Sequence, residues 1–340
     1  METGRRREHA RNPKLEALLQ ELNGLLAGGE DQVVRRFSQP KHPVVFVMGC
    51  ARSGTTLLQQ YMTATGVFSY PSNLVARFYR APYIGARIQQ MLTDSDYDFG
   101  EELTAGNADM ARGFSSRLGK TRGILSPSEF WYFWRLFFPS QEIQHYTPET
   151  LQTIDTRSFV AEIAALESVR GQPLLMKGLY LNWNIGFLSQ LFDKAVFVHI
   201  RRNPFYNMQS LLRARRDFFA QEERWYSFKP PEYAELADCP VDEQLAGQVY
   251  YTNQAISKGL ATLAPERRLV IDYELLCAQP DAVFARLAEQ LATQGCDLDV
   301  PSDVPVALRP SCQREVSEKR MQALIGAYRV LSGEDLDLAV

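Results

Sequence analysis

The sequence predicts an α/β fold in which a central parallel sheet is covered by helices on both faces. Four short apolar runs, at residues 44–48, 174–177, 195–200 and 268–272, are each followed by a helical pattern. Apolar runs without polar alternation are typical of strands that are buried on both faces. With 340 residues, of which 45% are hydrophobic and 23% charged, the chain has enough apolar side chains for a sizeable core.

The charge balance and the cysteines exclude several classes of protein. The net charge of -3 and the pI of about 5.9 argue against a general nucleic-acid binder, which would carry a strong basic excess. No uninterrupted apolar stretch approaches the roughly 20 residues that span a bilayer. The five cysteines are scattered, with no pair at metal-ligand spacing, so we expect a protein of the reducing cytoplasm.

Residues 1–40 are expected to form an amphipathic helix and a linker, ahead of one main domain over residues 41–340. Polar residues interrupt the leucine-rich stretch after the first arginines, so this stretch does not fit a secretion signal. Its leucines recur at helical spacing, at Leu15, Leu18, Leu19, Leu22, Leu25 and Leu26. Gly28 and Gly29 are expected to end the helix. The helix is expected to pack on the body of the protein or on a partner. The partner could be a second copy of the chain, which would give a homo-oligomer.

The first apolar run leads directly into a glycine-rich loop. Strand residues 44–48 are followed by Gly49, four residues, Gly54 and a new helix. Such a strand, loop and helix gather backbone N–H groups and a positive helix end around one anion. A nucleoside triphosphate loop has lysine directly after its second glycine, whereas here Thr55 stands there and the cation comes earlier, at Arg52. The alternative is a plain glycine turn between a strand and a helix.

The loop residues Arg-Ser-Gly-Thr-Thr, after an apolar strand, resemble the 5′-phosphosulfate loop of the sulfotransferases. These enzymes use 3′-phosphoadenosine 5′-phosphosulfate (PAPS) as co-substrate. The resemblance implies a P-loop-like three-layer fold with a helical substrate cap. It also implies that the 5′-phosphosulfate is held by Arg52, Ser53, Gly54, Thr55 and Thr56.

A second anion motif follows the third apolar run, about 150 residues further along the chain. Arg202 stands at the end of this run, and Ser210 follows eight residues later in a predicted helix over residues 205–216. This spacing resembles the 3′-phosphate site of the sulfotransferases. Arginine grips phosphate oxygens with two hydrogen bonds, and the hydroxyl adds a third donor. Arg213 is one turn beyond and is expected to assist, while Arg215 and Arg216 are expected on a solvated helix face.

The resemblance also points to residues outside the two anion motifs. Sulfotransferases often close over the 3′-phosphate with a late basic loop, for which Arg309 and Arg314 are candidates, with solvated surface as the alternative. A segment at Tyr273 and Glu274 resembles a "Tyr-Glu-Asp-Leu" motif of the family, with Leu275 where aspartate is usual, and we interpret it as mainly structural.

Lys177 ends the second apolar run, and ligands bind at the carboxyl ends of strands in open α/β sheets. The resemblance implies that it supports the transferring sulfuryl group, whereas the alternative is a solvated strand end. Glu129 is the first candidate for the catalytic base, because it precedes an aromatic stretch over residues 130–138 in a helix expected to begin near Ser126. Desolvation there would raise its pKa. A capping carboxylate is the alternative, and His145 is the second candidate base.

Two insertions, around residues 70–150 and 217–240, are expected to bind the acceptor, with residues 94–123 as a substrate-binding region or lid. The sequence thus predicts transfer of a sulfuryl group from PAPS to a hydroxyl of a carbohydrate, a glycolipid or another small metabolite. Adenosine 3′,5′-bisphosphate (PAP) would be the product, and no metal is expected because protein cations take that part. The alternatives are a nucleoside or small-molecule kinase with a degenerate P-loop and a non-catalytic nucleotide-binding protein.

Overall fold

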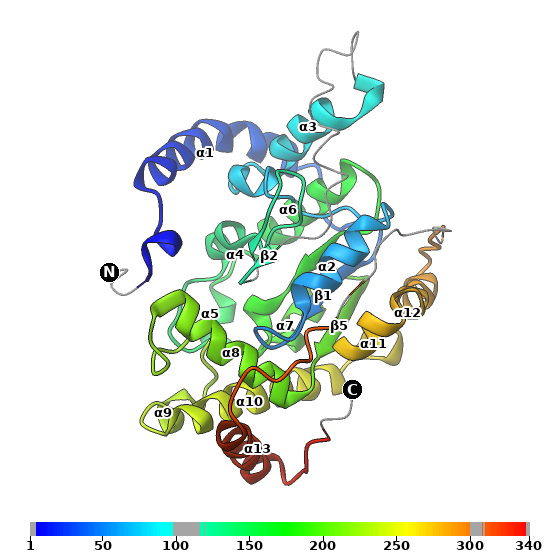
Figure 1. The fold of residues 1–340 in the computed structure, drawn as a ribbon. Coiled ribbons are helices and arrows are strands. Elements are labelled where there is room, and N and C mark those ends of the chain that lie inside the picture. Colours follow the sequence, from blue (N-terminus) through cyan, green and yellow to red (C-terminus); the bar gives the residue numbers. More distant parts are fainter. Residues whose placement is uncertain (1–4, 98–115, 119, 300–307, 309, 338–340) are drawn as a thin grey trace.

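The chain is organised around four parallel strands in the order β4–β1–β5–β6. Figure 1 labels the two central strands, β1 and β5. This computed structural model describes residues 5–97, 116–118, 120–299, 308 and 310–337. The strands are β1 (Val44–Met48), β4 (Leu175–Lys177), β5 (Ala195–Arg201) and β6 (Arg268–Asp272). Val44 of β1 lies opposite Ala195 of β5, and Val45 lies opposite Leu175 of β4. The four apolar runs of the sequence therefore form the predicted strands of one parallel sheet.

Helices cover both faces of the sheet, which confirms the predicted three-layer arrangement. Phe46 and its alternate neighbours in β1 pack toward one helical layer, while Val45 and Val47 pack toward the other. The layer on the Phe46 side contains α4 (Trp131–Phe137), α6 (Thr156–Ser168), α7 (Ile185–Gln190) and α10 (Val241–Ala261). The opposite layer contains α2 (Thr55–Ala64), α11 (Tyr273–Ala278) and α12 (Pro280–Ala292). The alternation of side chains along each strand thus supplies both halves of the core.

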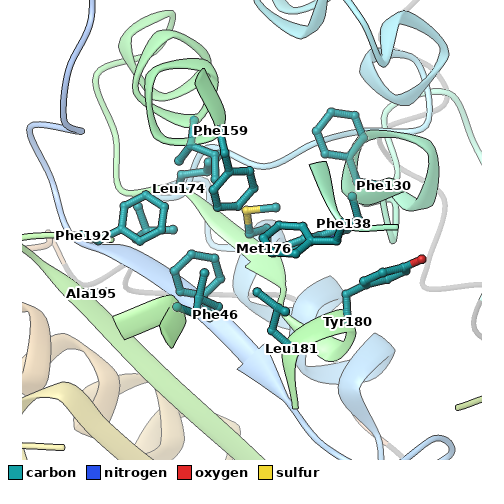
Figure 2. Packing of buried hydrophobic residues seen from close by; sticks show 14 of the residues in the cluster. Phe46, Phe130, Phe138, Phe159, Leu174, Met176, Tyr180, Leu181, Phe192 and Ala195 are labelled. Atoms are coloured by element: carbon teal, nitrogen blue, oxygen red, sulfur yellow. The ribbon is translucent and has the colours of Figure 1, made fainter. Parts of the chain in front are cut away.

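Aromatic side chains from strands, helices and the segments between them fill the core on the Phe46 side (Figure 2). Phe159 of α6 lies 5.3 Å from the ring of Phe138 and 6.1 Å from that of Phe192. Phe46 lies between Phe192 and Phe197, at centroid distances of 5.3 and 5.4 Å. The aromatic stretch over residues 130–138 is therefore mostly packing, because four of its side chains, Phe130, Phe133, Trp134 and Phe138, are buried.

A third group of helices packs beside the end of β5, where Arg202 follows the strand. The helix α8 (Pro204–Phe219) follows β5 and packs against α10 and α13 (Glu318–Ser332). Further short elements complete the described chain: η1 (Arg7–His9), η2 (Val75–Phe78), α3 (Pro82–Thr93), η3 (Ser95–Tyr97), β2 (Ser116–Arg117), β3 (Lys120–Thr121), α5 (Pro148–Gln152), η5 (Leu179–Leu181), α9 (Tyr233–Leu236) and η6 (Pro265–Arg267).

The N-terminal helix is longer than the sequence predicts. Helix α1 (Pro13–Val34) runs through Gly28 and Gly29, so the prediction that these glycines end it is wrong. Glu30, the residue after Gly29, is buried and accepts hydrogen bonds from the N–H groups of Tyr83 and Ile84 at 2.6 and 3.0 Å. These contacts at the start of α3 hold the last turns of α1 in place, and tertiary contacts of this kind override the low helix propensity of glycine.

Helix α1 packs on the body of the protein, but the face that it buries contains only one of its leucines. It contacts α3 and α6, and its buried residues are Leu19, Asn23, Glu30 and Val34. Three leucines of the outer face, Leu18, Leu22 and Leu25, are exposed. A homo-oligomer through this helix stays a prediction, which light scattering on the full chain would check.

Two further boundaries differ from the sequence prediction. The helix expected near Ser126 begins only at Trp131. The chain before it is held by an isolated bridge between Pro127 and Ser72 and by the hydrogen bond from Ser128 N to Pro71 O at 2.8 Å. The acceptor lid expected over residues 94–123 falls largely on residues 98–115 and 119, outside the described residues. No helix of the described chain is both long and apolar enough to cross a membrane. All five cysteines lie in described segments and are free thiols.

Candidate functional site

The glycine-rich loop lies at the carboxyl end of β1 and is shaped by two left-handed residues. Arg52 has a φ of 69° and Gly54 a φ of 104°. A Cβ atom added to Gly54 would lie 2.5 Å from Cδ2 of Tyr273, so the position requires glycine for space as well as for backbone conformation. Gly49 is equally crowded, since an added Cβ would lie 2.7 Å from Ser53 Oγ. The loop therefore has little freedom to adopt another shape.

Side chains from neighbouring elements hold the carbonyl groups of this loop. Asn182 Nδ2 donates to Gly49 O at 3.0 Å, and Asn207 Nδ2 donates to Ala51 O at 2.8 Å. Arg202 Nη1 donates to the carbonyl oxygen of Arg52 at 3.2 Å. With three carbonyl groups bound in this way, the orientation of the intervening peptide planes is fixed. Such preorganisation suits a loop that binds an anion through its N–H groups.

The first turn of α2 supplies N–H groups at the mouth of the loop. Its N-cap is Gly54, which contributes no capping side chain. The N–H groups of Thr55 and Thr56 belong to the turn that has no intrahelical acceptors, so they are suited to an external anion. The N–H of Ser53 donates to Cys50 O at 3.2 Å within the loop, and its predicted contact with the 5′-phosphosulfate stays a prediction. Its buried Oγ has no hydrogen-bond partner among the described residues.

The two predicted anion motifs lie side by side. Arg52 Nε donates to Ser210 Oγ at 3.2 Å, and Arg202 contacts the backbone of Arg52 as described above. Burial, reinforced by the nearby charges of Arg213 and Arg202, lowers the pKa of the Arg52 guanidinium. The ring of Tyr273 lies under the guanidinium of Arg202, with 4.8 Å between Cζ and the ring centroid. Two cations are thus held next to each other at the ends of β1 and β5.

The outer arginines of α8 have different surroundings. Arg213 Nη1 lies 2.7 Å from Glu315 Oε1 in a partly exposed ion pair, close enough to act on Arg52. Arg215, expected on a solvated face, is instead fully buried, where Nη1 donates to Gln244 Oε1 at 2.8 Å. Its role is structural, because it links α8 to the start of α10.

The segment that includes Ser311 and Gln313 passes beside Arg202. Arg202 Nη2 donates to Ser311 O, and Ser311 N donates to Tyr273 Oη at 3.0 Å. Gln209 Nε2 donates to Gln313 O at 2.8 Å, which fastens the segment to α8. Arg314, the candidate in this segment, forms an exposed ion pair with Glu318. The other candidate, Arg309, lies outside the described residues, so a role for either arginine stays a prediction.

Lys177 lies at the end of β4 between the loop and the candidate base. Its Nζ donates to Thr56 Oγ1 at 2.7 Å and lies 2.8 Å from Glu129 Oε1. The lysine side chain is 1% exposed and that of the glutamate 19%. The alternative of a solvated strand end is therefore excluded for Lys177. The sequence predicts an unpaired Glu129 beside apolar side chains. The structure differs, because the carboxylate of Glu129 pairs with the ammonium group of Lys177.

The second candidate base is less well placed. His145 is exposed, whereas its neighbours Gln144 and Tyr146 are buried and bonded to Tyr180 O and to Asn184. Among the described residues, Lys177 Nζ is bonded to Thr56 and Glu129, and not to His145. Glu129 thus remains the first candidate, and neither assignment is more than a prediction. The described residues contain no group of three or more His, Cys, Asp or Glu side chains arranged to hold a metal ion.

A known protein family has a model that matches most of the chain. The model of the sulfotransferase family matches residues 43–295, which contain the loop, Lys177, Arg202 and Ser210. The chain belongs to the sulfotransferase family. Family membership makes it a transferase by class. No curated protein sequence matches the chain.

Several solved sulfotransferase structures resemble this sulfotransferase over most of its length. A sulfotransferase from Mycobacterium tuberculosis is 16% identical, with 90% of this chain and 78% of that chain covered and a TM-score of 0.48. One from Mycobacterium avium is 13% identical, with 96% and 87% covered and a TM-score of 0.47. The sulfotransferase domain of the Synechococcus olefin synthase is 19% identical, with 88% and 86% covered and a TM-score of 0.38.

Sequence reasoning missed several residues that shape the site of this sulfotransferase. Tyr273 belongs to a segment predicted to be mainly structural, yet its ring leaves no room for a Cβ at Gly54 and lies against the guanidinium of Arg202. Its place directly after the fourth strand was the signal, because that strand also ends at the ligand edge of the sheet. Asn182 and Asn207 carry no sequence signal of their own, since their partners are backbone carbonyls far along the chain.

Proposed function

We propose that this sulfotransferase transfers a sulfuryl group from PAPS to a hydroxyl group of a carbohydrate, a glycolipid or another small metabolite. The observation that carries the proposal is the contact between the two anion motifs. Arg52 is bonded to Ser210 through Nε and to Arg202 through its carbonyl oxygen. One nucleotide with a phosphate at each end of its ribose can therefore meet both motifs.

The residues at the site fit a donor with two anionic ends. The first turn of α2 and the loop amides of Arg52, Gly54, Thr55 and Thr56 suit the 5′-phosphosulfate. Arg202 and Ser210 suit the 3′-phosphate, with Arg213 beside them. Arg202 Nε is buried without a partner among the described residues, so this guanidinium has a donor to spare. An unmatched buried donor is costly, and a bound phosphate oxygen would remove that cost.

The chemistry requires a positioned base and stabilisation of the leaving group. PAPS supplies the sulfuryl group, whose sulfur bonds to the acceptor oxygen as its bond to the bridging phosphate oxygen breaks. Glu129 accepts the acceptor proton at Oε1. Lys177 and the loop amides stabilise the negative charge that builds up on the leaving phosphate. Lys177 can turn to the donor only if it loosens its ion pair with Glu129, so donor binding and release of the base are linked.

Aromatic side chains next to Glu129 support an acceptor with an apolar or sugar face. The ring of Trp131 lies 5.8 Å from that of Tyr180 and 5.3 Å from that of Phe228. Phe228 belongs to the predicted insertion over residues 217–240 and Trp131 to that over residues 70–150. The two insertions therefore meet beside the candidate base, where a sugar ring or a lipid chain could pack.

The proposal is tested by binding measurements with PAP and with ATP plus magnesium. A larger thermal shift with PAP is expected, and Arg202→Ala should lower PAP affinity by about 2 kcal/mol or more, roughly 30-fold. The matched control is Arg201→Ala. Arg201 is the preceding residue of β5, but it is 48% exposed and pairs with Asp272 at 3.0 Å, so PAP affinity should not change.

Acceptor screening with labelled PAPS completes the test. Transfer of label to a hydroxyl compound is the expected result. Magnesium-dependent turnover of ATP without PAP binding would support a kinase instead. Tight PAP binding without transfer to any acceptor would support a non-catalytic nucleotide-binding protein.

A further inference from the structure

The two carboxylate oxygens of Glu129 have different partners. Oε1 lies 2.8 Å from Lys177 Nζ, while Oε2 accepts a hydrogen bond from Trp131 Nε1 at 2.6 Å. The lysine side chain has other acceptors within reach, since Nζ also bonds to Thr56 Oγ1. The indole N–H has one direction only, because the ring is rigid. The carboxylate is therefore held between an adjustable cation and a fixed donor.

The backbone turn between Glu129 and Trp131 makes this hydrogen bond possible. Phe130 adopts a left-handed conformation, with φ 57° and ψ 34°, which bulky residues rarely do. This conformation folds the indole back over the carboxylate two residues earlier. The ring of Phe130 is buried and stacks on Phe133 with 4.5 Å between centroids, and its N–H donates to Ser128 Oγ at 3.2 Å. Strained conformations that the surroundings hold in place are concentrated at functional sites.

The indole ring is itself held by its neighbours. Trp131 is half-buried, and its ring packs between Tyr180, which follows Lys177 by three residues, and Phe228. Tyr180 is buried in the core on the Phe46 side. The position of the N–H donor is thus defined by side chains from two other segments. The bond to Oε2 would persist even when the bond between Oε1 and Lys177 is broken.

We propose that Trp131 is a positioning residue for the carboxylate of Glu129, an inference that rests on the proposed function of Glu129 as the base. When Lys177 turns toward the donor, Oε1 loses its partner and must stay aimed at the acceptor hydroxyl. The Trp131 hydrogen bond keeps it there, because it fixes the second oxygen of the same rigid carboxylate. A base held within hydrogen-bonding reach of its proton transfers it more efficiently than one that rotates freely.

The substitution Trp131→Phe tests the inference, because it keeps an aromatic ring against Tyr180 and Phe228 and removes the N–H donor. We expect kcat to fall about tenfold or more, with PAP affinity unchanged. The acid limb of the pH profile of kcat should move to higher pH, because a lost hydrogen bond to the carboxylate disfavours its ionised form. The matched control is Trp134→Phe. Trp134 is buried one turn further on and stacks on Tyr180 without bonding to Glu129, so this variant should lose thermal stability and keep kcat and the pH profile.

A spectroscopic measurement makes the test independent of the acceptor. The chain has four tryptophans (Trp 4), so ¹⁵N-labelled indole gives few signals, which Trp→Phe variants assign. The Trp131 indole signal should move in Glu129→Gln and should change little when PAP is added to the wild-type chain. If the chemical shift of the Trp131 indole is the same in Glu129→Gln as in the wild type, the inference is overturned. Normal kcat and an unshifted acid limb in Trp131→Phe would also overturn it if Glu129→Gln is inactive. If Glu129→Gln is fully active, or if PAP does not bind, the proposed function itself fails.

Discussion

Lys177 Nζ lies 2.7 Å from Thr56 Oγ1 and 2.8 Å from Glu129 Oε1, so one buried ammonium group connects the anion loop with the candidate base. The three residues come from α2, β4 and the segment before α4, and no two of them are close in sequence. A buried lysine needs a counterion, and Glu129 supplies it in the absence of a donor. A donor anion at the loop would compete with Glu129 for the same ammonium group.

This competition predicts the behaviour of Glu129→Gln. Turnover should fall by about 10²–10⁴-fold, since the variant lacks the carboxylate that takes the acceptor proton. PAP affinity should be kept or should rise, because Lys177 no longer has an anionic side chain to hold it away from the donor. Calorimetric titration with PAP, beside the sulfuryl-transfer rate, measures both effects.

The control for this prediction is Glu142→Gln. Glu142 also pairs with a lysine, Lys229 at 2.6 Å, but its side chain is 71% exposed and lies outside the site. This variant should change neither turnover nor PAP affinity. A tenfold loss of PAP affinity in Glu129→Gln would contradict the competition, because the glutamate would then support the donor site.

Gly54→Ala tests the crowding between the loop and Tyr273. The added Cβ would lie 2.5 Å from the Tyr273 ring, and the φ of 104° is strained for any residue with a side chain. The ring of Tyr273 cannot move without leaving Arg202, so PAP affinity should fall about tenfold or more as the stability falls. Calorimetry and thermal unfolding measure the two quantities.

Gly66→Ala is the matched control for the backbone strain. Gly66 has a φ of 77°, and an added Cβ would meet nothing within 4 Å. This variant should lose about 1 kcal/mol of unfolding free energy and bind PAP as the wild type does. Wild-type PAP binding by Gly54→Ala would show that the contact with Tyr273 is dispensable.

The buried His199 makes a contribution to the free energy of unfolding that is lost in mild acid. Burial lowers its pKa to about 4, while Nε2 contacts Asn253 Oδ1 at 3.2 Å. In the unfolded chain the histidine has a pKa of about 6.5 and takes up a proton below that pH. In the folded chain His199 takes up this proton only near pH 4. The contribution is therefore complete above pH 6.5 and is lost as the pH falls toward 4. It amounts to about 2 kcal/mol less at pH 5 than at pH 7.

Urea unfolding at pH 7 and pH 5 measures this effect, with His199→Gln as the comparison. Glutamine can keep the contact with Asn253 and cannot take up a proton, so the variant should lose less stability between the two pH values. An identical loss in the variant and the wild type would rule out His199 as the source.

The sequence predicted the sheet, and the proximity of the two anion motifs, better than the surroundings of Glu129 and the helix ends. The strands were predictable because each is an uninterrupted apolar run, and Arg52, Arg202 and Ser210 lie at fixed distances from strand ends. The end of α1 was not predictable, because Glu30 holds it through contacts with Tyr83 and Ile84 more than 50 residues away.

The surroundings of Glu129 were also out of reach of the sequence. The contact with Lys177 joins residues 48 positions apart, and it depends on how the segment before α4 crosses the end of β4. The bond from Trp131 depends on the left-handed Phe130, a conformation that no residue type there indicates. The aromatic stretch suggested apolar surroundings for Glu129. Most of its side chains are buried in the core instead, and the carboxylate of Glu129 pairs with Lys177.

The most direct test of the central claim compares PAP with adenosine 5′-phosphate in the wild-type chain and in Arg202→Ala by calorimetry. If the motifs around Arg52 and Arg202 hold the two ends of one nucleotide, the wild type should prefer PAP by about 30-fold or more, and the variant should lose nearly all of this preference. A variant that binds more weakly but still prefers PAP as strongly as the wild type would contradict the claim, because Arg202 would then not contact the 3′-phosphate.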